Sequence, residues 1–293
     1  MTVLVLDPGY PAELLDGLAV VREPGPDVEA VLTMPRTPVG AAELEALPAL
    51  RVIATGTIGY DHVDVEAAAA RGIWVCNVPD YCVEEVADHT LALLYALLRG
   101  IVGLDRNVRA GGWDSRAAGP LRTIAGLRVG VIGYGRIGSA VGRRLAAVGC
   151  EVWPSDVARV GVPVVSLEEV LDGCDAITLH VPLTGETEGL IGEAELARMR
   201  PGALLLNTSR GRVVDVDAMV TALRDGRLGG AALDVLPEEP PPRVPELPNL
   251  IVTPHAAWYS AEAERNAWAG AVAAVRAALR GERPATVVPE TDS

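Results

Sequence analysis

Short apolar runs alternate with longer stretches of helical periodicity along almost the whole chain, and this alternation limits the fold more than any other feature. The runs have the length of strands, and the stretches between them place apolar residues three and four positions apart, as one face of a helix requires. Strands joined through helices in this way form parallel sheets. The expected strands are residues 2–6, 29–33, 51–54 and 73–76, followed by 127–132, 151–153, 175–180, 203–206, 230–234 and 250–253.

Two long helical patterns are expected to carry the chain between two domains. One covers about 83–110 and ends before Gly111, and the other covers about 260–280 and ends before Gly281, a residue type favoured just past helix ends. Shorter helices are expected at 12–18, 41–47 and 64–72. We therefore predict an α/β fold of two Rossmann-like, doubly wound parallel-sheet domains, with residues 95–261 inserted into a domain made of 1–94 and 262–293.

The composition allows a large core and excludes several classes of partner. Hydrophobic residues make up 49% of the chain, and no apolar run is long enough to cross a membrane as a helix. The first residues have the pattern of a strand and turn, without the features of a signal peptide. A net charge of −14 at pH 7 disfavours binding to nucleic acid or to an anionic membrane, since both need a basic surface. The four cysteines form no CxxC pair and have no histidine at zinc spacing, which predicts reduced thiols, no metal site and a cytoplasmic location.

All 25 basic residues are arginine, and the chain contains no lysine. This excludes a Schiff-base lysine, a pyridoxal-phosphate lysine and the phosphate-binding lysine of nucleotide hydrolases. Catalysis must therefore depend on Arg, His, Asp, Glu, Tyr or Cys, or on a bound cofactor.

A glycine-rich segment, GYGRIG (133–138), directly follows the strand at 127–132 and precedes a helical pattern. In such a segment Gly133 makes a tight turn, Gly135 lets a pyrophosphate approach the backbone, and Gly138 lets the helix pack closely on the strand. The amides at the helix start then face the phosphates, and Arg136 either adds charge there or lies exposed. This arrangement predicts a dinucleotide site.

The strand after this helix ends at Asp156, eighteen positions beyond Gly138 (156 − 138 = 18). An acidic side chain at this place accepts hydrogen bonds from the adenosine ribose and repels a 2′-phosphate. Asp156 therefore favours NAD as the cofactor. Arg159, three positions later, leaves NADP open as an alternative, and a turn-capping role is the structural alternative for Asp156.

Three later strands each end in a segment that carries charged or titratable side chains. The segments are LNTSRG (206–211), DVLPEEP (234–240) and TPHAAWYS (253–260). Parallel strands end at one edge of a sheet, so these side chains are expected to gather there. Together with GYGRIG, the segments resemble the D-isomer-specific 2-hydroxyacid dehydrogenase family over about residues 51–281.

The resemblance implies an NAD-dependent oxidoreductase that moves hydride between a nicotinamide and a small 2-oxo or 2-hydroxy acid. It places the catalytic set on Arg210, Glu239 and His255, and the spacing from Arg210 selects Glu239 over Glu238. The arginine fork can engage the carboxylate and the carbonyl of a 2-oxo acid. His255 would exchange a proton with the substrate oxygen, while Glu239 would hold the other ring nitrogen and favour the charged ring.

The resemblance also assigns binding residues and the roles of the two domains, with NAD bound by residues 95–261. The loop TGTIGYD (55–61) looks like the family's carboxylate-binding loop, and Asp234 resembles the acid that holds the nicotinamide amide. The expected cofactor residues are Gly133, Gly135, Arg136, Ile137, Gly138, Asp156, Val181, Pro182, Thr187, Thr208, Ser209, Arg210, Asp234, His255 and Ala257. The expected substrate residues are Ile58, Gly59, Arg210 and Trp258.

The segment that follows His255 is similar to that of the C-terminal-binding co-repressors, a branch that keeps the dehydrogenase site while serving as transcriptional partners. The segments NVP (77–79) and VEEVAD (83–88) resemble the same branch. Trp258 would then lie against the substrate side chain, which favours a hydrophobic or thioether 2-oxo acid. Core packing at a domain junction is the alternative role for Trp258.

Two alternative functions stay open. One is an NAD(H)-binding regulatory protein of the co-repressor type with little turnover. The other is a biosynthetic reductase of an unusual acid such as a phosphonate, although Ala54 and Thr55 stand where some relatives carry an extra cation. The resemblance implies a homodimer, with which the apolar helical segment 91–98 is consistent. His180 is expected to be structural, and His89 to serve an interface or a polar network.

Overall fold

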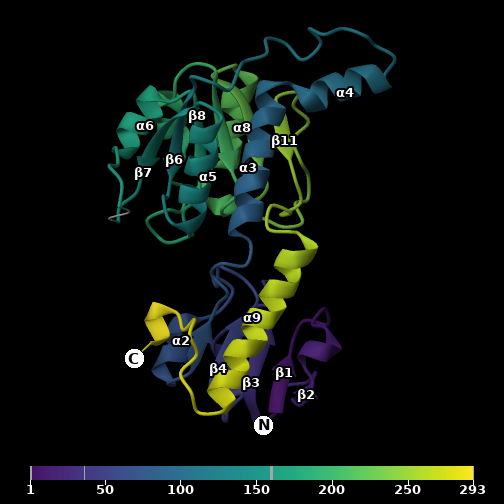
Figure 1. Cartoon of the computed structure of the whole chain (residues 1–293), viewed down its shortest axis with the longest axis vertical. Helices are drawn as coiled ribbons and strands as arrows, with labels where there is room; N and C mark the ends of the chain where they lie inside the picture. The colour runs from purple at the N-terminus through teal and green to yellow at the C-terminus, as the bar shows by residue number, and fades with distance from the viewer. Residues whose placement is uncertain (1, 36, 159–160, 293) are drawn as a thin grey trace. The chain divides into compact units, whose positions relative to one another are not determined.

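The computed structural model describes residues 2–35, 37–158 and 161–292, and it divides the chain into two compact units (Figure 1). The first unit contains the residues up to Tyr81 and those from Ser260 onward, and the second contains Cys82–Tyr259. Each unit has its own parallel sheet, which confirms the predicted fold class. The boundaries predicted from the sequence, 94/95 and 261/262, differ from this division, and the first of them would cut a helix that packs wholly within the second unit.

The first unit has a five-stranded sheet of order β2-β1-β3-β4-β5, and all its strands are parallel. The strands are β1 (Thr2–Val5), β2 (Ala19–Val21), β3 (Val28–Thr33), β4 (Val52–Thr55) and β5 (Trp74–Cys76). The helices are α1 (Ala41–Glu45), α2 (Val65–Ala70) and α9 (Ala261–Leu279), with 3-10 turns η1 (Ala12–Leu14) and η3 (Pro289–Thr291).

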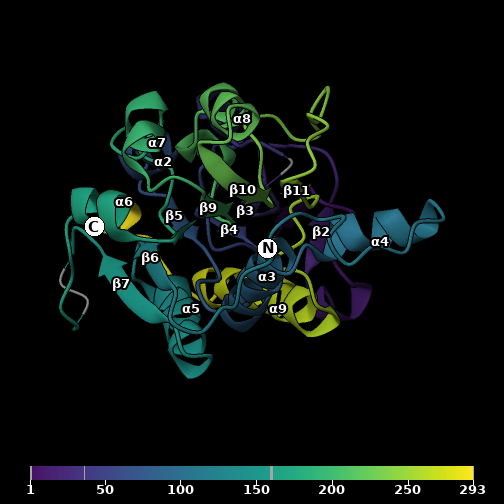
Figure 2. The ribbon, with the colours of Figure 1, turned by 90° about the horizontal axis from the view of Figure 1, so that it is seen from above.

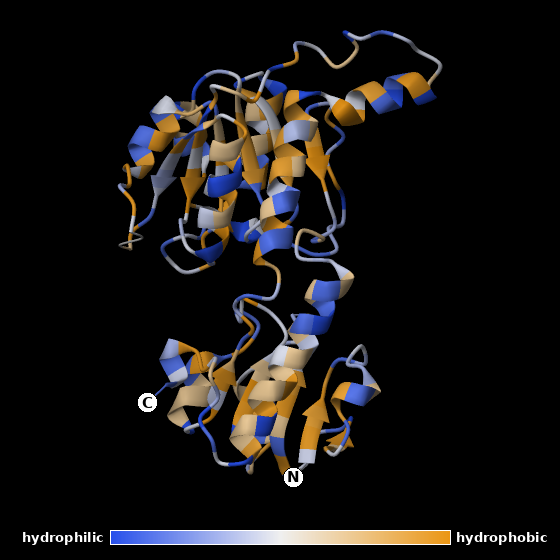
Figure 3. Cartoon of the chain, in the orientation of Figure 1, coloured by the Kyte–Doolittle hydropathy of each residue, from blue (hydrophilic) through white to orange (hydrophobic). Residues whose placement is uncertain are grey.

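Alternate residues of these strands enter two different cores. Val52 and Ala54 pack in the cluster that contains α9, whereas Ile53 packs in the cluster that contains Leu44 of α1 and Ala68 of α2. This is the two-residue periodicity of a strand that is buried on both faces. The ribbon coloured by hydropathy accordingly shows the strands as predominantly apolar (Figure 3).

The sequence analysis differs from the structure at two places in the first unit, one wrong prediction and one omission. Residues 12–18 do not form a helix, because only the turn η1 forms before Gly17 takes a left-handed φ of 75°. The short edge strand β2 was not predicted, since its residues are partly exposed and lack a buried apolar run.

The second unit has a six-stranded parallel sheet of order β11-β10-β9-β8-β6-β7. Its strands are β6 (Arg128–Ile132), β7 (Glu151–Ser155), β8 (Ala176–Leu179), β9 (Ala203–Asn207), β10 (Leu228–Leu233) and β11 (Leu250–Val252). The helices are α3 (Val83–Leu98), α4 (Ile101–Arg109), α5 (Arg136–Ala147), α6 (Leu167–Gly173), α7 (Glu193–Arg198) and α8 (Val216–Arg224), and η2 (Gly211–Val213) is a 3-10 turn. Helices α3 and α5 cover one face of this sheet, and α6, α7 and α8 cover the other (Figure 2).

The predicted single helix at 83–110 is two helices with a bend of 60°. α3 ends at Leu98, Gly100 has a left-handed φ of 58°, and α4 begins at Ile101. A Cβ at Gly100 would lie 2.5 Å from the Cβ of Ala118, so only glycine permits both this backbone conformation and this contact. α4 extends away from the sheet of its unit and contains no buried residue (Figure 1). Among the described residues, no single helix is long and apolar enough to cross a membrane, and α3 and α4 pass that test only as a bent pair.

Candidate active site

The loops that follow five strands of the second sheet carry most of the predicted site residues. β6, β8, β9, β10 and β11 run parallel, so these loops leave the same edge of the sheet. The order of strands changes sides at β6, because β7 is added on one side of β6 and β8 on the other, although all of these strands are parallel. Open α/β sheets bind ligands at the carboxyl ends of the strands beside such a change of sides.

The glycine-rich segment has the geometry of a phosphate cradle. Gly133 has a φ of 84°, and a Cβ there would lie 2.5 Å from the carbonyl oxygen of His180. A Cβ at Gly138 would lie 1.9 Å from the carbonyl oxygen of Gly133, so helix and loop are packed backbone to backbone. Gly135 precedes α5, and a Cβ at that position would meet no atom within 4 Å. The open space beside Gly135 and the amino end of α5, where Arg136 and Ile137 are the first two residues, fit a pyrophosphate.

Asp156 lies beside this cradle at the end of β7. Its carboxylate accepts hydrogen bonds from the amide of Tyr134 at 2.6 Å and from the amide of Ala158 at 2.8 Å. One carboxylate oxygen therefore faces the glycine-rich loop, which is compatible with the predicted ribose site, and the other caps the turn at Ala158, which is the alternative role of Asp156. Asp156 also lines a hollow of about 520 Å³ together with Val157, Ala158, Gly161, Val162, Pro163 and Val164. Arg159, which left NADP open, lies outside the described residues.

The segment after β8 closes the other side of the cradle. A Cβ at Gly133 would lie 2.9 Å from Cγ1 of Val181, and Pro182 begins the following turn. The hydroxyl of Thr187 donates to the carbonyl of Pro182 at 2.6 Å and accepts from the amide of Thr184 at 2.8 Å. Thr187 thus stabilises the turn itself. Burial lowers the pKa of His180 to about 3, and its Nε2 lies 2.9 Å from the hydroxyl of Thr178, which fits a structural role.

Asn207, the last residue of β9, organises the turn that presents Arg210. Its buried side chain accepts hydrogen bonds from the amide and the hydroxyl of Ser209, and its Nδ2 donates to the carbonyl of Arg210 at 2.8 Å. The hydroxyl of Thr208 lies 3.1 Å from that of Thr90 on α3. The Arg210 guanidinium donates to the carbonyl of Ser209 at 2.8 Å. Sequence reasoning missed Asn207, although an asparagine two residues before a serine at a strand end is a usual signal of a side-chain-capped turn.

Gly211 brings the loops after β9 and β10 into backbone contact. A Cβ at this position would lie 2.0 Å from the carbonyl carbon of Leu236. Any larger residue would push apart the loops that carry Arg210 and Glu239. Gly211 was also missed, because its role depends on a contact with a loop 25 residues away (236 − 211 = 25).

Glu239 and His255 form a hydrogen-bonded pair. His255 Nδ1 lies 2.7 Å from Glu239 Oε2, while Glu239 Oε1 accepts from the amide of Leu236 at 3.0 Å. A carboxylate accepts only, so Nδ1 donates and Nε2 is the ring nitrogen left for a substrate. Partial burial tends to raise the pKa of Glu239, but the hydrogen bonds from His255 and Leu236 and the charges of His255 and Arg210 outweigh it and lower the pKa. All three predicted catalytic residues therefore interact at this edge.

Asp234 is buried and holds the turn that contains His255. Its Oδ1 accepts from the hydroxyl of Thr253 at 2.5 Å and from the amide of Ala256 at 2.9 Å, and its Oδ2 accepts from the amide of Ala257 at 2.9 Å. His255 has a φ of 53° and is the one described residue other than glycine with a positive φ. The amide of Ala257, a predicted cofactor residue, is thus directed at Asp234.

The remaining predicted substrate residues lie in both units. Trp258 follows the His255 turn and packs edge to face on Tyr259, with ring centroids 5.5 Å apart at 86°. Ile58 and Gly59 lie in the first unit, in the loop after β4. There Asn77 Nδ2 donates to the carbonyl of Ile58 at 2.7 Å, and the hydroxyl of Thr57 donates to the carbonyl of Gly59 at 2.6 Å.

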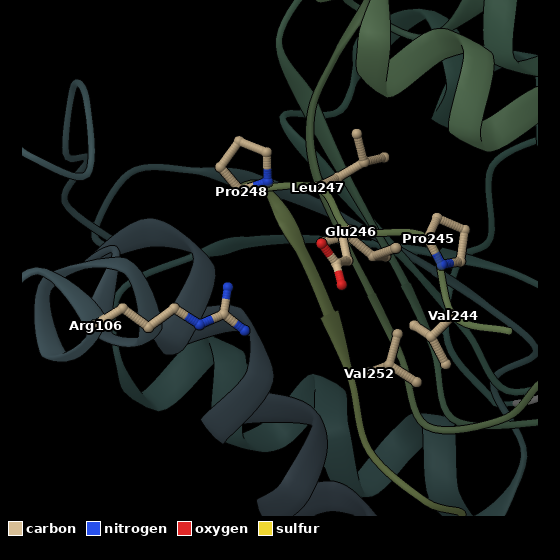
Figure 4. Close-up of a pocket in the computed structure, with 8 residues that line it drawn as sticks. Arg106, Val244, Pro245, Glu246, Leu247, Pro248 and Val252 are labelled. Carbon is tan, nitrogen blue, oxygen red and sulfur yellow. The ribbon is translucent and has the colours of Figure 1, made fainter. Parts of the chain in front are cut away.

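A second hollow, of about 640 Å³, lies elsewhere in the second unit (Figure 4). It is lined by Arg106 of α4 and by Val244, Pro245, Glu246, Leu247, Pro248, Leu250 and Val252. None of the predicted site residues lines it.

Comparisons with known proteins place the chain in one family. Residues 91–257 match the family model described as D-isomer specific 2-hydroxyacid dehydrogenase, NAD binding domain. The chain is 43% identical to a glycerate dehydrogenase of Methylorubrum extorquens over 239 residues, which cover 78% of this chain and 76% of that protein. It is 42% identical to a glyoxylate reductase of Korarchaeum cryptofilum over 284 residues, which cover 92% and 85%. A solved structure of D-lactate dehydrogenase from Aquifex aeolicus, complexed with NAD and lactic acid, matches with a TM-score of 0.87 and 29% identity over 96% of each chain.

Proposed function

Because the chain belongs to the D-isomer-specific 2-hydroxyacid dehydrogenase family of NAD-dependent oxidoreductases, we propose that it transfers hydride between NAD(H) and a small 2-oxo or 2-hydroxy acid. The observation that carries this proposal is the Glu239–His255 pair at 2.7 Å, within range of the Arg210 charge. Such a set can anchor a carboxylate and exchange one proton beside a bound nicotinamide.

The cofactor would be held by the glycine-rich loop, by the amino end of α5 and by Asp156. NADH held there would supply the hydride for C2 of the oxo acid. Arg210 would bind the substrate carboxylate and polarise the adjacent carbonyl with its planar fork. The turn organised by Asn207 holds the backbone of Arg210 in place.

The proton would come from Nε2 of His255. Glu239 fixes the ring by accepting from Nδ1, so that Nε2 can give a proton to the substrate oxygen during reduction and take it back during oxidation. Despite partial burial, the hydrogen bonds from His255 and Leu236 lower the pKa of Glu239, so this carboxylate is charged near neutral pH and accepts the hydrogen bond from Nδ1.

The substrate class follows from the relatives and from Trp258. The two relatives are named for glycerate and glyoxylate, so glyoxylate and hydroxypyruvate are the first candidates for this chain. We assign Ile58 and Gly59 to the substrate carboxylate and Trp258 to the substrate side chain. This role of Trp258 makes an apolar or thioether 2-oxo acid the second candidate, and the panel of acids below distinguishes it from glyoxylate and hydroxypyruvate.

We further propose a homodimer, located in the cytoplasm as the sequence predicts. The apolar segment 91–98 does not supply the interface, because Leu93, Leu94 and Leu98 are buried in the core of the second unit, so we assign the interface to α4 and the residues beside it. α4 has no buried residue, and Tyr95, Ile101, Val108 and Trp113 are 36%, 55%, 50% and 91% exposed. Apolar side chains grouped on an extended element usually mark an interface. The double variant Val108→Arg/Trp113→Arg should convert a dimer to a monomer in light scattering, whereas a wild-type monomer would exclude this interface.

The function is tested by NADH oxidation with a panel of 2-oxo acids. The panel contains glyoxylate, hydroxypyruvate, pyruvate, a branched-chain acid, the methionine-derived acid and phenylpyruvate. At least one acid should be reduced, and His255→Ala and Arg210→Ala should each lower kcat/KM by roughly a hundredfold or more. Tight NADH binding without turnover of any acid would instead support the regulatory alternative of the co-repressor type.

A further inference from the structure

His89 on α3 contacts the turn that carries His255, although it lies far from that turn in the sequence. Its Nε2 is 3.1 Å from the hydroxyl of Thr253 and 3.6 Å from Oδ1 of Asp234. The His89 side chain is 25% exposed, and that of Asp234 is 1% exposed. α3 itself is held on the sheet by Leu93, Leu94 and Leu98, so His89 projects from a rigid element.

The distances fix the direction of the hydrogen bonds. The Thr253 hydroxyl has one proton, and at 2.5 Å that proton goes to Oδ1 of Asp234. The hydroxyl oxygen must therefore accept from His89, which requires a proton on Nε2 of the ring. The chain of bonds runs from His89 to Thr253 and from Thr253 to Asp234.

Asp234 in turn fixes the backbone around His255 through three hydrogen bonds. Its carboxylate accepts from the amides of Ala256 and Ala257, and its carbonyl accepts from the amide of His255 at 2.8 Å. The φ of 53° at His255 is unfavourable for any residue with a Cβ, and it persists only where surrounding bonds impose it. Here the hydrogen bonds from the amides of His255, Ala256 and Ala257 to Asp234 impose this conformation.

We propose that His89 is a positioning residue of the active site, which fixes Thr253 and Asp234 and through them the backbone of His255. This inference rests on the proposed function for its effect on catalysis, but not for its effect on the turn. His89 acts through Thr253 and Asp234 and does not itself contact the reacting atoms. It keeps Nε2 of His255 at the place where a substrate oxygen would receive the proton.

The test compares His89→Leu, which removes the donor, with His89→Gln, which keeps an N–H at a similar reach. Hydrogen exchange of the ligand-free protein is measured for the amides of residues 255–257. These amides should exchange at least about tenfold faster in His89→Leu and in Thr253→Val, while His89→Gln should remain within about threefold of wild type. Asp88→Asn serves as the control, because Asp88 lies next to His89 on α3 and its ion pair is with Arg144 of α5, away from the turn.

Catalysis is the second readout, measured on the best 2-oxo acid. His89→Leu should lower kcat about tenfold with little change in the KM of the acid, and His89→Gln should recover most of it. The double variant His89→Leu/Thr253→Val should be no slower than Thr253→Val alone, since both changes break one chain of bonds.

Three results would overturn the proposal. They are unchanged exchange at residues 255–257 in His89→Leu, equal damage from Gln and Leu, or strict additivity with Thr253→Val. Because the exchange is measured without cofactor or substrate, it decides the positioning role even if the wild type reduces no acid on the panel. That outcome would reject the proposed function instead.

Discussion

The neutral imidazole of His180 should make the stability of the second unit depend on pH in a predictable way. Burial lowers the pKa of His180 to about 3 in the folded chain, whereas a histidine in an unfolded chain titrates near 6.5. Between these values the unfolded state binds the proton and the folded state does not, so stability falls as the pH falls below about 6.5. Above 6.5 both states are neutral and the contribution is constant.

The size of the loss follows from about 1.36 kcal/mol per pH unit inside this window. From pH 7.5 to 4.5, the folded chain should lose roughly 2–3 kcal/mol through His180 alone. His180→Asn keeps a polar side chain beside the Thr178 hydroxyl but removes the titration. Its free energy of unfolding should therefore decline less steeply with acid than that of the wild type.

Urea unfolding of both proteins at a series of pH values measures this difference. The gap between the two free energies of unfolding should change by roughly 2–3 kcal/mol across the window, in favour of His180→Asn at the acid end. Parallel curves for the two proteins between pH 7.5 and 4.5 would refute the reasoning, because they would mean that His180 binds its proton equally in both states.

Three further predictions concern the site. Gly138→Ala should lower both NADH affinity and the free energy of unfolding, because its Cβ would lie 1.9 Å from the Gly133 carbonyl oxygen. Gly135→Ala should weaken NADH binding with little loss of stability, because its Cβ would enter only the open space assigned to the pyrophosphate, and equal losses of stability in urea unfolding would contradict this. Asn207→Ala should lower kcat/KM by about tenfold, because it releases the turn that holds Ser209 and Arg210. An unaffected kcat/KM would show that the turn holds without the Asn207 side chain. Glu239→Gln should lower the free energy of unfolding above pH 4.5 and lower it progressively less below pH 4.5. The reason is that the pKa of Glu239 is lowered in the folded chain, so its stabilising contribution is lost as acid protonates the carboxylate. A loss independent of pH in urea unfolding would contradict this pKa shift.

The sequence predicted the sheets well because their strands are buried on both faces. Runs such as 129–132 and 203–206 are continuous, apolar and buried, which is typical of parallel strands covered by helices on both faces. The edge strand β2 has no such run, and its existence depends on pairing with β1 rather than on local pattern. The break between α3 and α4 was missed because a single glycine is tolerated within helical patterns, and the contact with Ala118 that makes Gly100 necessary is not local.

The sequence predicted those residues of the candidate site whose side chains are themselves charged or titratable. Arg210, Glu239 and His255 are charged or titratable groups at strand ends, and the family resemblance ordered them. Asn207 escaped notice because it acts on the backbone of its own turn, and Gly211 because it acts on the backbone of another loop, and neither role involves a ligand. The cofactor and substrate roles of the individual residues stay predictions.

The most direct test of the account is a double-mutant cycle on the Glu239–His255 pair, followed as kcat/KM for the best 2-oxo acid. His255→Ala should lower kcat/KM by roughly a hundredfold or more, Glu239→Gln by less, and the double variant by no more than His255→Ala alone, since Glu239 acts through the ring. Substantial activity in His255→Ala, or fully additive losses in the double variant, would contradict the claim that this pair carries the proton.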